Sequence, residues 1–290
     1  RVMSTSHEPA YSEGGMPKAR YRRYHAEKAR GGIALTMTAG SAVVSRDSPQ
    51  AFGNLHAWDD AIVPWLAELA DECHELGSAV MIQLTHLGRR TGWNKGDWLP
   101  SLSSTRLQEP AHRAFPKLAE DWDFARIVDD FASAAGRMKE GGMDGIELEA
   151  YGHLIDQLWS PLTNQLEGDY GPQTLDSRMR LGAEVLGALG QAYSRAGDRP
   201  QALKLFRQAL AADKNGYGSG KWQSLIKSTG YWLAIDEGDK ALKAGNLALA
   251  RQKYQQARQL DDSDGDAFIG LGDVAVASKD DAAAEGFYQQ

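Results

Sequence analysis

Four runs of apolar, β-branched or small residues in the first half of the chain have the character of buried strands. They are RVMSTSH (1–7), GIALTMTAGSAVV (32–44), SAVMIQLTHLG (78–88) and DGIELEAYG (144–152). Each run is almost continuously apolar, which is typical of strands that are covered on both faces of a parallel sheet. We therefore expect these four segments to pair as neighbours in one sheet.

Amphipathic segments separate the later strands. Residues 59–76 and 122–142 both carry apolar side chains three or four positions apart, as helices with one buried face do. Gly77 follows the first segment and Gly141 ends the second, where C-terminal glycines stop helices. Strands alternating with helices predict βαβ units. Cys73 lies on an apolar stripe, so we expect it to be a small core residue.

The pattern changes after about residue 183, where a 34-residue repeat begins. Three pairs of small or aromatic residues lie 34 positions apart: Gly238 and Gly272, Ala250 and Ala284, Tyr254 and Tyr288. An earlier unit carries the same residue types at Gly190, Tyr193, Ala202, Phe206 and Ala209. This period predicts tetratricopeptide repeats, in which pairs of antiparallel helices stack into a superhelix.

The two patterns predict two domains, an α/β domain over residues 1–182 and an all-α domain over residues 183–290. We expect the repeats to occupy 183–216, 231–264 and, truncated, 265–290, with an insert at 217–230. The amphipathic phase runs through the boundary, so one helix can serve both domains. The core of the repeats is expected to contain Tyr193, Phe206, Tyr254 and Phe268.

Composition narrows the range of functions. The net charge of −7 disfavours a nucleic-acid partner. The sequence contains no run of 18 apolar residues, so it predicts no membrane span. A single cysteine allows no internal disulfide. The seven histidines show no H-x-x-x-H spacing, so we expect no metal site.

Polar and titratable residues gather where the predicted strands end, which is where parallel sheets carry their chemistry. The strand ends carry ten such residues, Ser4, Ser6, His7, Gln83, His86, Arg89, Arg90, Glu149, Tyr151 and His153, together with Ala39 and Gly40. A solvated strand end is also polar, so this pattern alone leaves a structural interpretation open.

The motifs MIQLTHLGRR (81–90), GIELEAYGHLIDQLWSPLTNQ (145–165) and LDSRMRLGAEVL (175–186) resemble the old yellow enzyme family of NADH:flavin oxidoreductases, closest to its amine-demethylating branch. The resemblance covers about residues 1–186. It implies a TIM barrel that binds FMN, of which only strands one to four are present. The expected fold is therefore a partial (βα) barrel fused to a tetratricopeptide superhelix.

The resemblance also implies roles for particular residues. Gln83 would contact the flavin ring, and Ser4, Thr5, Ala39 and Gly40 would line it. Tyr151 and His153 would anchor the substrate and donate a proton. Glu149 stands where the family usually has a histidine, and a carboxylate there suits a cationic amine better than an enone oxygen.

The family places a basic residue on strand five and holds the FMN phosphate in loops after strands seven and eight. Neither feature follows residue 186. We therefore expect FMN to bind weakly or not at all and the oxidoreductase half to be incomplete for catalysis. The alternative is a functional FMN-dependent oxidoreductase that is completed by oligomerisation.

The segments KWQSLIKSTGYWLAIDEGDKALKAGNLALARQKYQQARQLD (221–261) and GLGDVAVASKD (270–280) resemble the tetratricopeptide region of bacterial cellulose synthase operon protein C. This implies a scaffold without catalysis, which binds a protein or peptide on its concave face. The flavin half implies the cytoplasm and the repeat half implies the periplasm, so the compartment stays open.

A half-barrel leaves two strand edges and an inner face open, which favours self-association. We expect the inner face to present Met3, Met37 and Ile82 or their neighbours. Either two half-barrels form a homodimer, or the first repeat helices cover the inner face of the sheet. The second arrangement is slightly favoured, because the repeats also need a cap.

Overall fold

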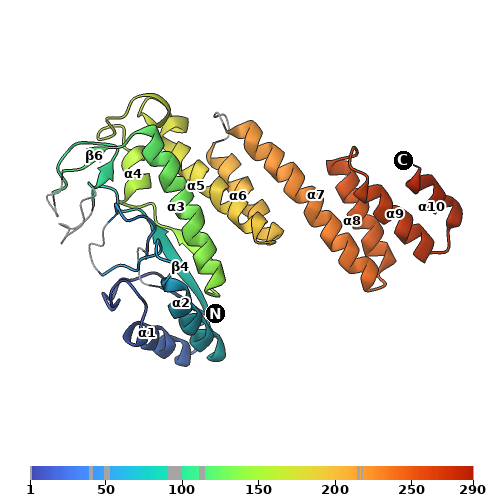
Figure 1. The fold of residues 1–290 in the computed structure, drawn as a ribbon, viewed down its shortest axis with the longest axis horizontal. Helices are drawn as coiled ribbons and strands as arrows, with labels where there is room; N and C mark the ends of the chain where they lie inside the picture. The colour runs from blue at the N-terminus through green and yellow to red at the C-terminus, as the bar shows by residue number, and fades with distance from the viewer. Residues whose placement is uncertain are drawn as a thin grey trace.

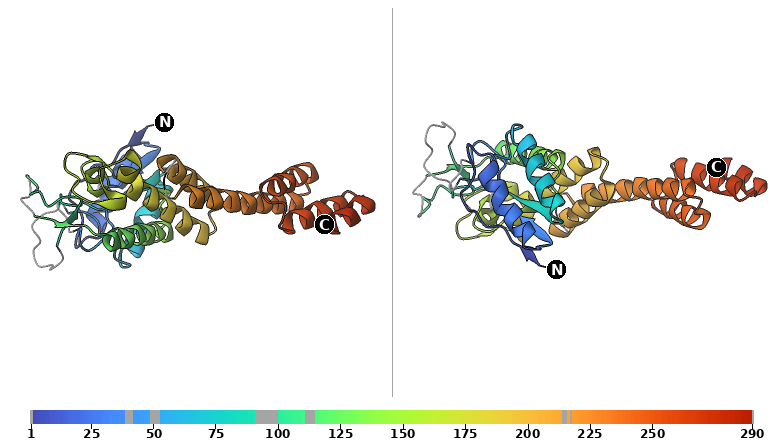
Figure 2. Two further views of the ribbon diagram at one scale, coloured as in Figure 1. Left: turned by 90° about the horizontal axis from the view of Figure 1, so that it is seen from above. Right: turned by 90° about the horizontal axis from the view of Figure 1, so that it is seen from below.

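The computed structural model shows an α/β unit that continues into an arm of helices, with the C-terminus at the far end of the arm (Figures 1 and 2). No helix of the described part is long and apolar enough to cross a membrane. The structure describes residues 2–38, 42–48, 53–90, 100–110, 115–213, 216 and 218–289.

The sheet is parallel, and its strands lie side by side in the order in which they occur in the chain. Its strands are β1 (Met3–Ser4), β2 (Leu35–Met37), β3 (Ala42–Val43), β4 (Ala79–Thr85) and β7 (Gly145–Leu148). β1 pairs with β2, β2 and β3 pair with successive parts of β4, and β7 also pairs with β4. Each of the four predicted runs thus contains a strand, and the second run is divided into β2 and β3. A separate two-stranded parallel ribbon, which the sequence did not predict, consists of β5 (Leu102–Ser103) and β6 (Lys117–Leu118).

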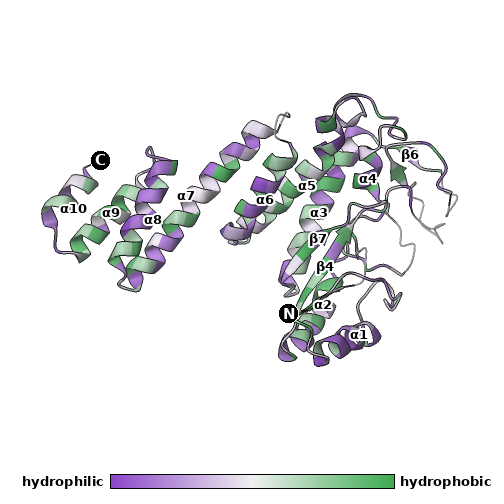
Figure 3. Cartoon of the chain, turned by 180° about the vertical axis from the view of Figure 1, so that it is seen from behind, coloured by the Kyte–Doolittle hydropathy of each residue, from purple (hydrophilic) through white to green (hydrophobic). Residues whose placement is uncertain are grey.

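Three helices belong to the α/β unit: α1 (Ala19–Arg30), α2 (Ile62–Glu75) and α3 (Asp121–Glu140). Ile82 and Leu84 are fully buried in one core with Leu66 and Phe131 of α2 and α3. In Figure 3, β4 is largely hydrophobic, whereas α1 is largely hydrophilic. Cys73 is buried in the same core, as predicted.

The opposite face of β4 carries Met81 and Gln83, because side chains alternate along a strand. Met81 lies against Gly145 of β7, where an added Cβ would come within 3.1 Å of the Met81 methyl carbon. The prediction that Ile82 lines the inner face of the sheet is therefore wrong. Ile82 packs under the helices, and its neighbour Met81 takes the inner position.

One unbroken helix, α5 (Leu175–Arg195), crosses residue 182, as the continuous amphipathic phase indicated. Its N-cap residue is Thr174, whose side chain accepts a hydrogen bond from the Ser177 amide. Preceded by α4 (Leu154–Trp159) and the short 3-10 helix η1 (Gly168–Tyr170), α5 packs against α3 and α4. It therefore joins the outer helical layer, and the prediction that repeat helices cover the inner face of the sheet is wrong.

The arm consists of helices joined by short turns. They are α6 (Arg199–Ala212), α7 (Ser219–Lys243), α8 (Leu247–Leu260), α9 (Asp266–Ala277) and α10 (Asp281–Tyr288). α5 pairs with α6, α7 with α8, and α9 with α10. α7 is 25 residues long and links the two helical groups (Figure 2).

One packing contact recurs in all three helix pairs. An added Cβ would come within 2.6 Å of the Phe206 ring at Gly190, 2.7 Å of Tyr254 at Gly238 and 2.3 Å of Tyr288 at Gly272. The missing side chain lets an aromatic ring of the second helix lie directly on the first helix. The tyrosine hydroxyls of the last two pairs also donate to an aspartate on that first helix, each at 2.7 Å.

Three of the four predicted core residues of the repeats are buried: Tyr193, Phe206 and Tyr254. Phe268 is only half-buried, with the Arg258 guanidinium 5.0 Å from its ring centre. The reason is helical phase, because its neighbours Ala267 and Leu271 occupy the buried face of α9.

Candidate functional site

Gln83 lies near the carboxyl end of the central strand β4 and is 3% exposed. Its side-chain amide nitrogen donates to Ser6 Oγ at 2.9 Å and to Glu147 Oε2 at 3.3 Å. Gln83 and Glu147 are paired in the β4–β7 register, so both project from the same face of the sheet. The amide is thus fixed on the face that lies away from the helices.

Glu149 follows β7 and accepts a hydrogen bond from the Tyr151 amide at 2.7 Å. Burial raises the pKa of Glu149, and the nearby charge of Glu147 raises it further. The side chain of Tyr151 itself is 83% exposed. The turn after β7 thus offers a carboxyl group and, further out, a phenol.

His153 is buried at the residue that precedes α4, and its Nδ1 lies 2.7 Å from Thr85 Oγ1. Burial lowers its pKa from an ordinary value of 6.5 to about 4, and the positive charge of Arg90 adds to this effect. The imidazole is therefore neutral at pH 7. It can donate and accept hydrogen bonds, but it is a weak base and carries no charge as an imidazolium.

Ser4 does not join the polar side chains around Gln83. The Ser4 hydroxyl accepts a hydrogen bond from Lys28 of α1 at 3.0 Å, whereas Ser6 is the serine beside Gln83. Thr5 is exposed between them. Ala39 and Gly40, which the resemblance assigns to the flavin ring, lie outside the described residues.

Sequence reasoning missed Glu147 and Gln157. Gln157 of α4 is buried and joins the turns that follow β4 and β7. Its side-chain oxygen accepts from the Arg89 amide at 3.1 Å, and its nitrogen donates to the Leu87 and Gly152 carbonyls at 3.2 Å each. Strand alternation from Gln83 could have found Glu147, whereas nothing local distinguishes Gln157.

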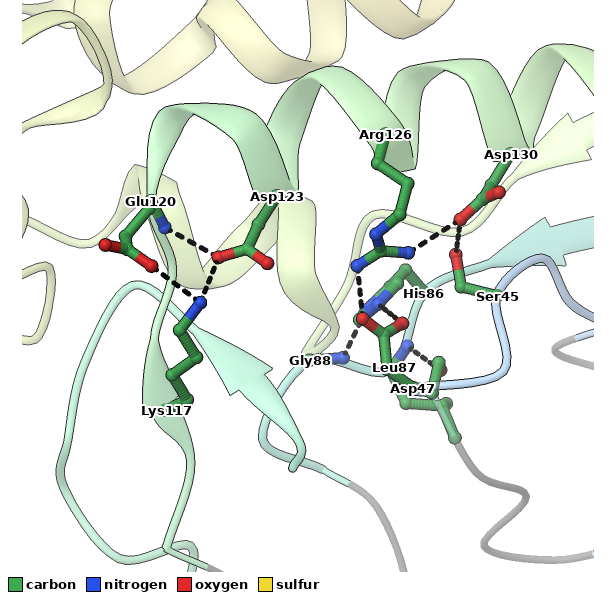
Figure 4. A network of polar contacts seen from close by, with 11 residues as sticks. Ser45, Asp47, His86, Leu87, Gly88, Lys117, Glu120, Asp123, Arg126 and Asp130 are labelled. Atoms are coloured by element: carbon green, nitrogen blue, oxygen red, sulfur yellow. Dashed lines mark hydrogen bonds and ion pairs between the residues drawn. The ribbon is translucent and has the colours of Figure 1, made fainter. Parts of the chain in front are cut away.

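A second polar network ties the end of β4 to α3 (Figure 4). His86 Nδ1 accepts from the Gly88 amide at 3.1 Å, so its Nε2 carries the hydrogen that points to Asp47, also at 3.1 Å. Arg126 pairs with both Asp47 and Asp130. Burial alone would raise the pKa of Asp47, but His86 and Arg126 hold it below its ordinary value. All these groups have partners, which indicates a structural role.

A cavity of about 1010 Å³ lies between α3, α5 and the beginning of α7, and Gln83 does not line it. Among the groups that line it, Arg180 pairs with Asp169 and Glu184, and the Trp222 indole donates to Asp213. We assign this cavity to the junction between the two helical layers. Among the described residues, no group of three metal-binding side chains is found.

Two buried histidines predict acid sensitivity. His25, fully buried with Nδ1 2.8 Å from Thr36 Oγ1, has its pKa lowered to about 3 by burial and secondarily by Lys28. The pKa of His153 is about 4, and both groups regain their ordinary 6.5 on unfolding. The unfolded chain therefore binds more protons between these values and 6.5.

We expect the free energy of unfolding to fall as the pH is lowered from 6.5 to 4. The expected loss is about 2 kcal/mol for each histidine at pH 5. Urea unfolding at half-unit pH steps measures it, and His25→Gln should make the dependence shallower. A stability that does not change over this interval would contradict the burial of both neutral rings.

The fold places the α/β unit among TIM-barrel-like proteins. The old yellow enzyme homologue of Zymomonas mobilis superposes with a TM-score of 0.62 at 20% identity, covering 69% of this chain and 57% of that chain. The sequence model of the NADH:flavin oxidoreductase / NADH oxidase family matches residues 2–207. The chain belongs to this family, and the match extends into α6.

Individual relatives confirm both resemblances. A protein of Rhizobium meliloti (strain 1021) named probable N-methylproline demethylase is 63% identical over 198 residues, which are 68% of this chain and 29% of that protein. The N,N-dimethylglycine/sarcosine dehydrogenase of Chromohalobacter salexigens is 46% identical over 192 residues, 65% of this chain and 28% of its own. Cellulose synthase operon protein C of Escherichia coli (strain K12) is 54% identical over 89 residues, 31% of this chain and 8% of its own. The chain thus spans less than a third of the length of each relative.

Proposed function

We propose that the chain joins a flavin-oxidoreductase half-barrel, residues 1–182, to a tetratricopeptide scaffold, residues 183–290. The observation that carries the first part is the buried Gln83 amide at the carboxyl end of the central strand. Its two neighbours come from the two sides of the sheet: Ser6 follows β1, and Glu147 belongs to β7. Family membership supplies FMN as the expected cofactor.

The residues fit one part of FMN better than the other. A buried amide and the Ser6 hydroxyl suit the polar edge of the isoalloxazine ring, and FMN supplies hydride transfer when it is bound. The phosphate is a dianion that requires cations or free amides. Glu147 and Glu149 give this end of the sheet two carboxyl groups, which do not suit a phosphate. The proposal is therefore weak binding through the ring.

A secondary or tertiary amine is the substrate class that the side chains favour. Glu149 would hold the ammonium group, Tyr151 would close over it, and the neutral His153 would offer a hydrogen bond. The names of the two amine-oxidising relatives agree with this choice. The alternative substrate, an activated alkene, would need a hydrogen-bond donor where Glu149 stands.

For the second half we propose tetratricopeptide repeats that stack as a superhelix and bind a protein or peptide on the concave face. The recurring glycine–aromatic contact in the three helix pairs supports this proposal. The similarity to cellulose synthase operon protein C suggests a partner in cellulose biosynthesis or export. The repeats would then position the flavin-related half beside that partner.

Titration with both FMN and riboflavin tests the flavin proposal. If the ring alone is held, the two flavins should bind with dissociation constants within about threefold of each other. Gln83→Ala should weaken both by roughly tenfold, because a buried hydrogen-bonding group is lost. Flavin fluorescence measures binding, and Gln252→Ala on the exposed surface of α8 is the matched control.

Two results would contradict this proposal. FMN that remains stoichiometric through gel filtration would show that a phosphate site exists and would favour the alternative, a functional oxidoreductase completed by oligomerisation. Binding of neither flavin at millimolar concentration would remove the cofactor altogether.

A further inference from the structure

The two outer strands of the sheet are only partly covered. All four residues of β7 are half-exposed, although Ile146 and Leu148 pack against the core under the helices. In β4, which has neighbours on both sides, the last four residues are buried. The helices do cover one face of β7, so its exposure arises at its free edge.

β1 shows the same feature at the opposite side of the sheet. Met3 is 55% exposed and the preceding Val2 is 70% exposed. The Val2 carbonyl accepts from the Ala34 amide, so the backbone polar groups of the next residue, Met3, point to the open edge. On β7, the Glu149 amide donates to the Leu84 carbonyl, so Gly145 and Glu147 face β4 and the amides of Ile146 and Leu148 point to the other open edge.

We propose that these two edges pair with a second copy of the chain, β7 of each copy lying beside β1 of the other. The inference rests on the proposed relation of residues 1–182 to half of a barrel. A parallel strand with a free edge extends the sheet at β7 and keeps all strands in one direction, and β1 of another copy is such a strand. A two-fold axis through the barrel makes both contacts at once.

Closure explains the face of the sheet that α5 leaves uncovered. Eight strands are enough to close a barrel whose interior is filled by side chains. Met81 and the half-buried Leu35 would then lie inside, with Gln83 at one end. Pairing of both edges also removes the exposed strands that otherwise promote uncontrolled aggregation.

The experiment measures the mass of the whole chain by light scattering and the exchange of its strand amides by NMR. We expect about 63 kDa, twice the 31.6 kDa of one chain, with slow exchange at Met3, Ile146 and Leu148. Met3→Pro removes an edge amide and should shift the mass towards 32 kDa. Met3→Ala keeps that amide and should remain dimeric.

A chain that is monomeric at 100 µM, or a dimer whose mass Met3→Pro leaves unchanged, overturns the inference. If Met3→Pro unfolds the sheet, the exchange of Ile146 and Leu148 in the unaltered dimer decides alone: rapid exchange refutes edge pairing and slow exchange supports it. Titration of the same fractions with FMN and riboflavin separates the two proposals. A dimer that binds neither flavin at millimolar concentration retains the edge pairing and rejects the cofactor, and a monomer that binds both flavins does the reverse.

Discussion

Replacing Phe206 with alanine is expected to lower the free energy of unfolding by about 3–5 kcal/mol, the usual range for a buried phenylalanine. Phe206 is 1% exposed and belongs to a core that also contains Phe124 and Phe131 of α3. Its ring lies on Gly190, which has no side chain that could fill the cavity. Urea unfolding followed by circular dichroism measures the loss.

Phe268→Ala provides the matched control. The ring of Phe268 is half-buried and lies outside the core of the last helix pairs, so its removal should cost about 1 kcal/mol. A loss below about 1 kcal/mol for Phe206→Ala would show that the repeat register at this helix pair is wrong. Equal losses at the two sites would contradict the difference in burial.

The strands could be predicted because their signal is local. Near-continuous apolar runs bounded by glycine define β4 and β7, and alternation with helices determines that they are parallel. The sequence does not show which face of β4 lies under the helices, because Met81 on one face and Ile82 on the other are both apolar. The choice depends on α2 and α3, which cover Ile82.

The candidate site was predictable only in part. Gln83, Glu149, Tyr151 and His153 follow from motifs at strand ends, and the structure gathers them around the ends of β4 and β7. The protonation of His153 could not be predicted, because it depends on burial and on Arg90, which is 63 positions away in the sequence. Burial and long-range charge effects of this kind leave no periodic pattern in the sequence.

The segment 217–230 shows a similar limit. The repeat period identified it as additional sequence between two units. In the structure its described residues begin α7 and continue into the next repeat helix without a break. One end of α7 lies against α6, and the other end belongs to the core of α8 and α9. The additional residues thus lengthen a helix that joins the two cores.

Trp222, in this segment, is expected to be as important as Phe206. It is 2% exposed, and its indole nitrogen donates to Asp213 at 3.1 Å. An added Cβ at Gly187 of α5 would come within 2.2 Å of the indole ring, so the ring lies flush against that helix. Trp222→Ala should therefore cost about 3–5 kcal/mol, through the cavity and through the partner lost by the buried Asp213 carboxylate.

Trp232→Ala, ten residues further along the same helix, is the control. Trp232 is 38% exposed, so its loss should cost about 1 kcal/mol or less. Trp222→Phe should fall between the two, because it keeps most of the ring and loses the hydrogen bond to Asp213. If Trp222→Ala costs no more than Trp232→Ala, the beginning of α7 does not pack on α5. The segment 217–230 would then be a tether between two independent units and not a shared helix.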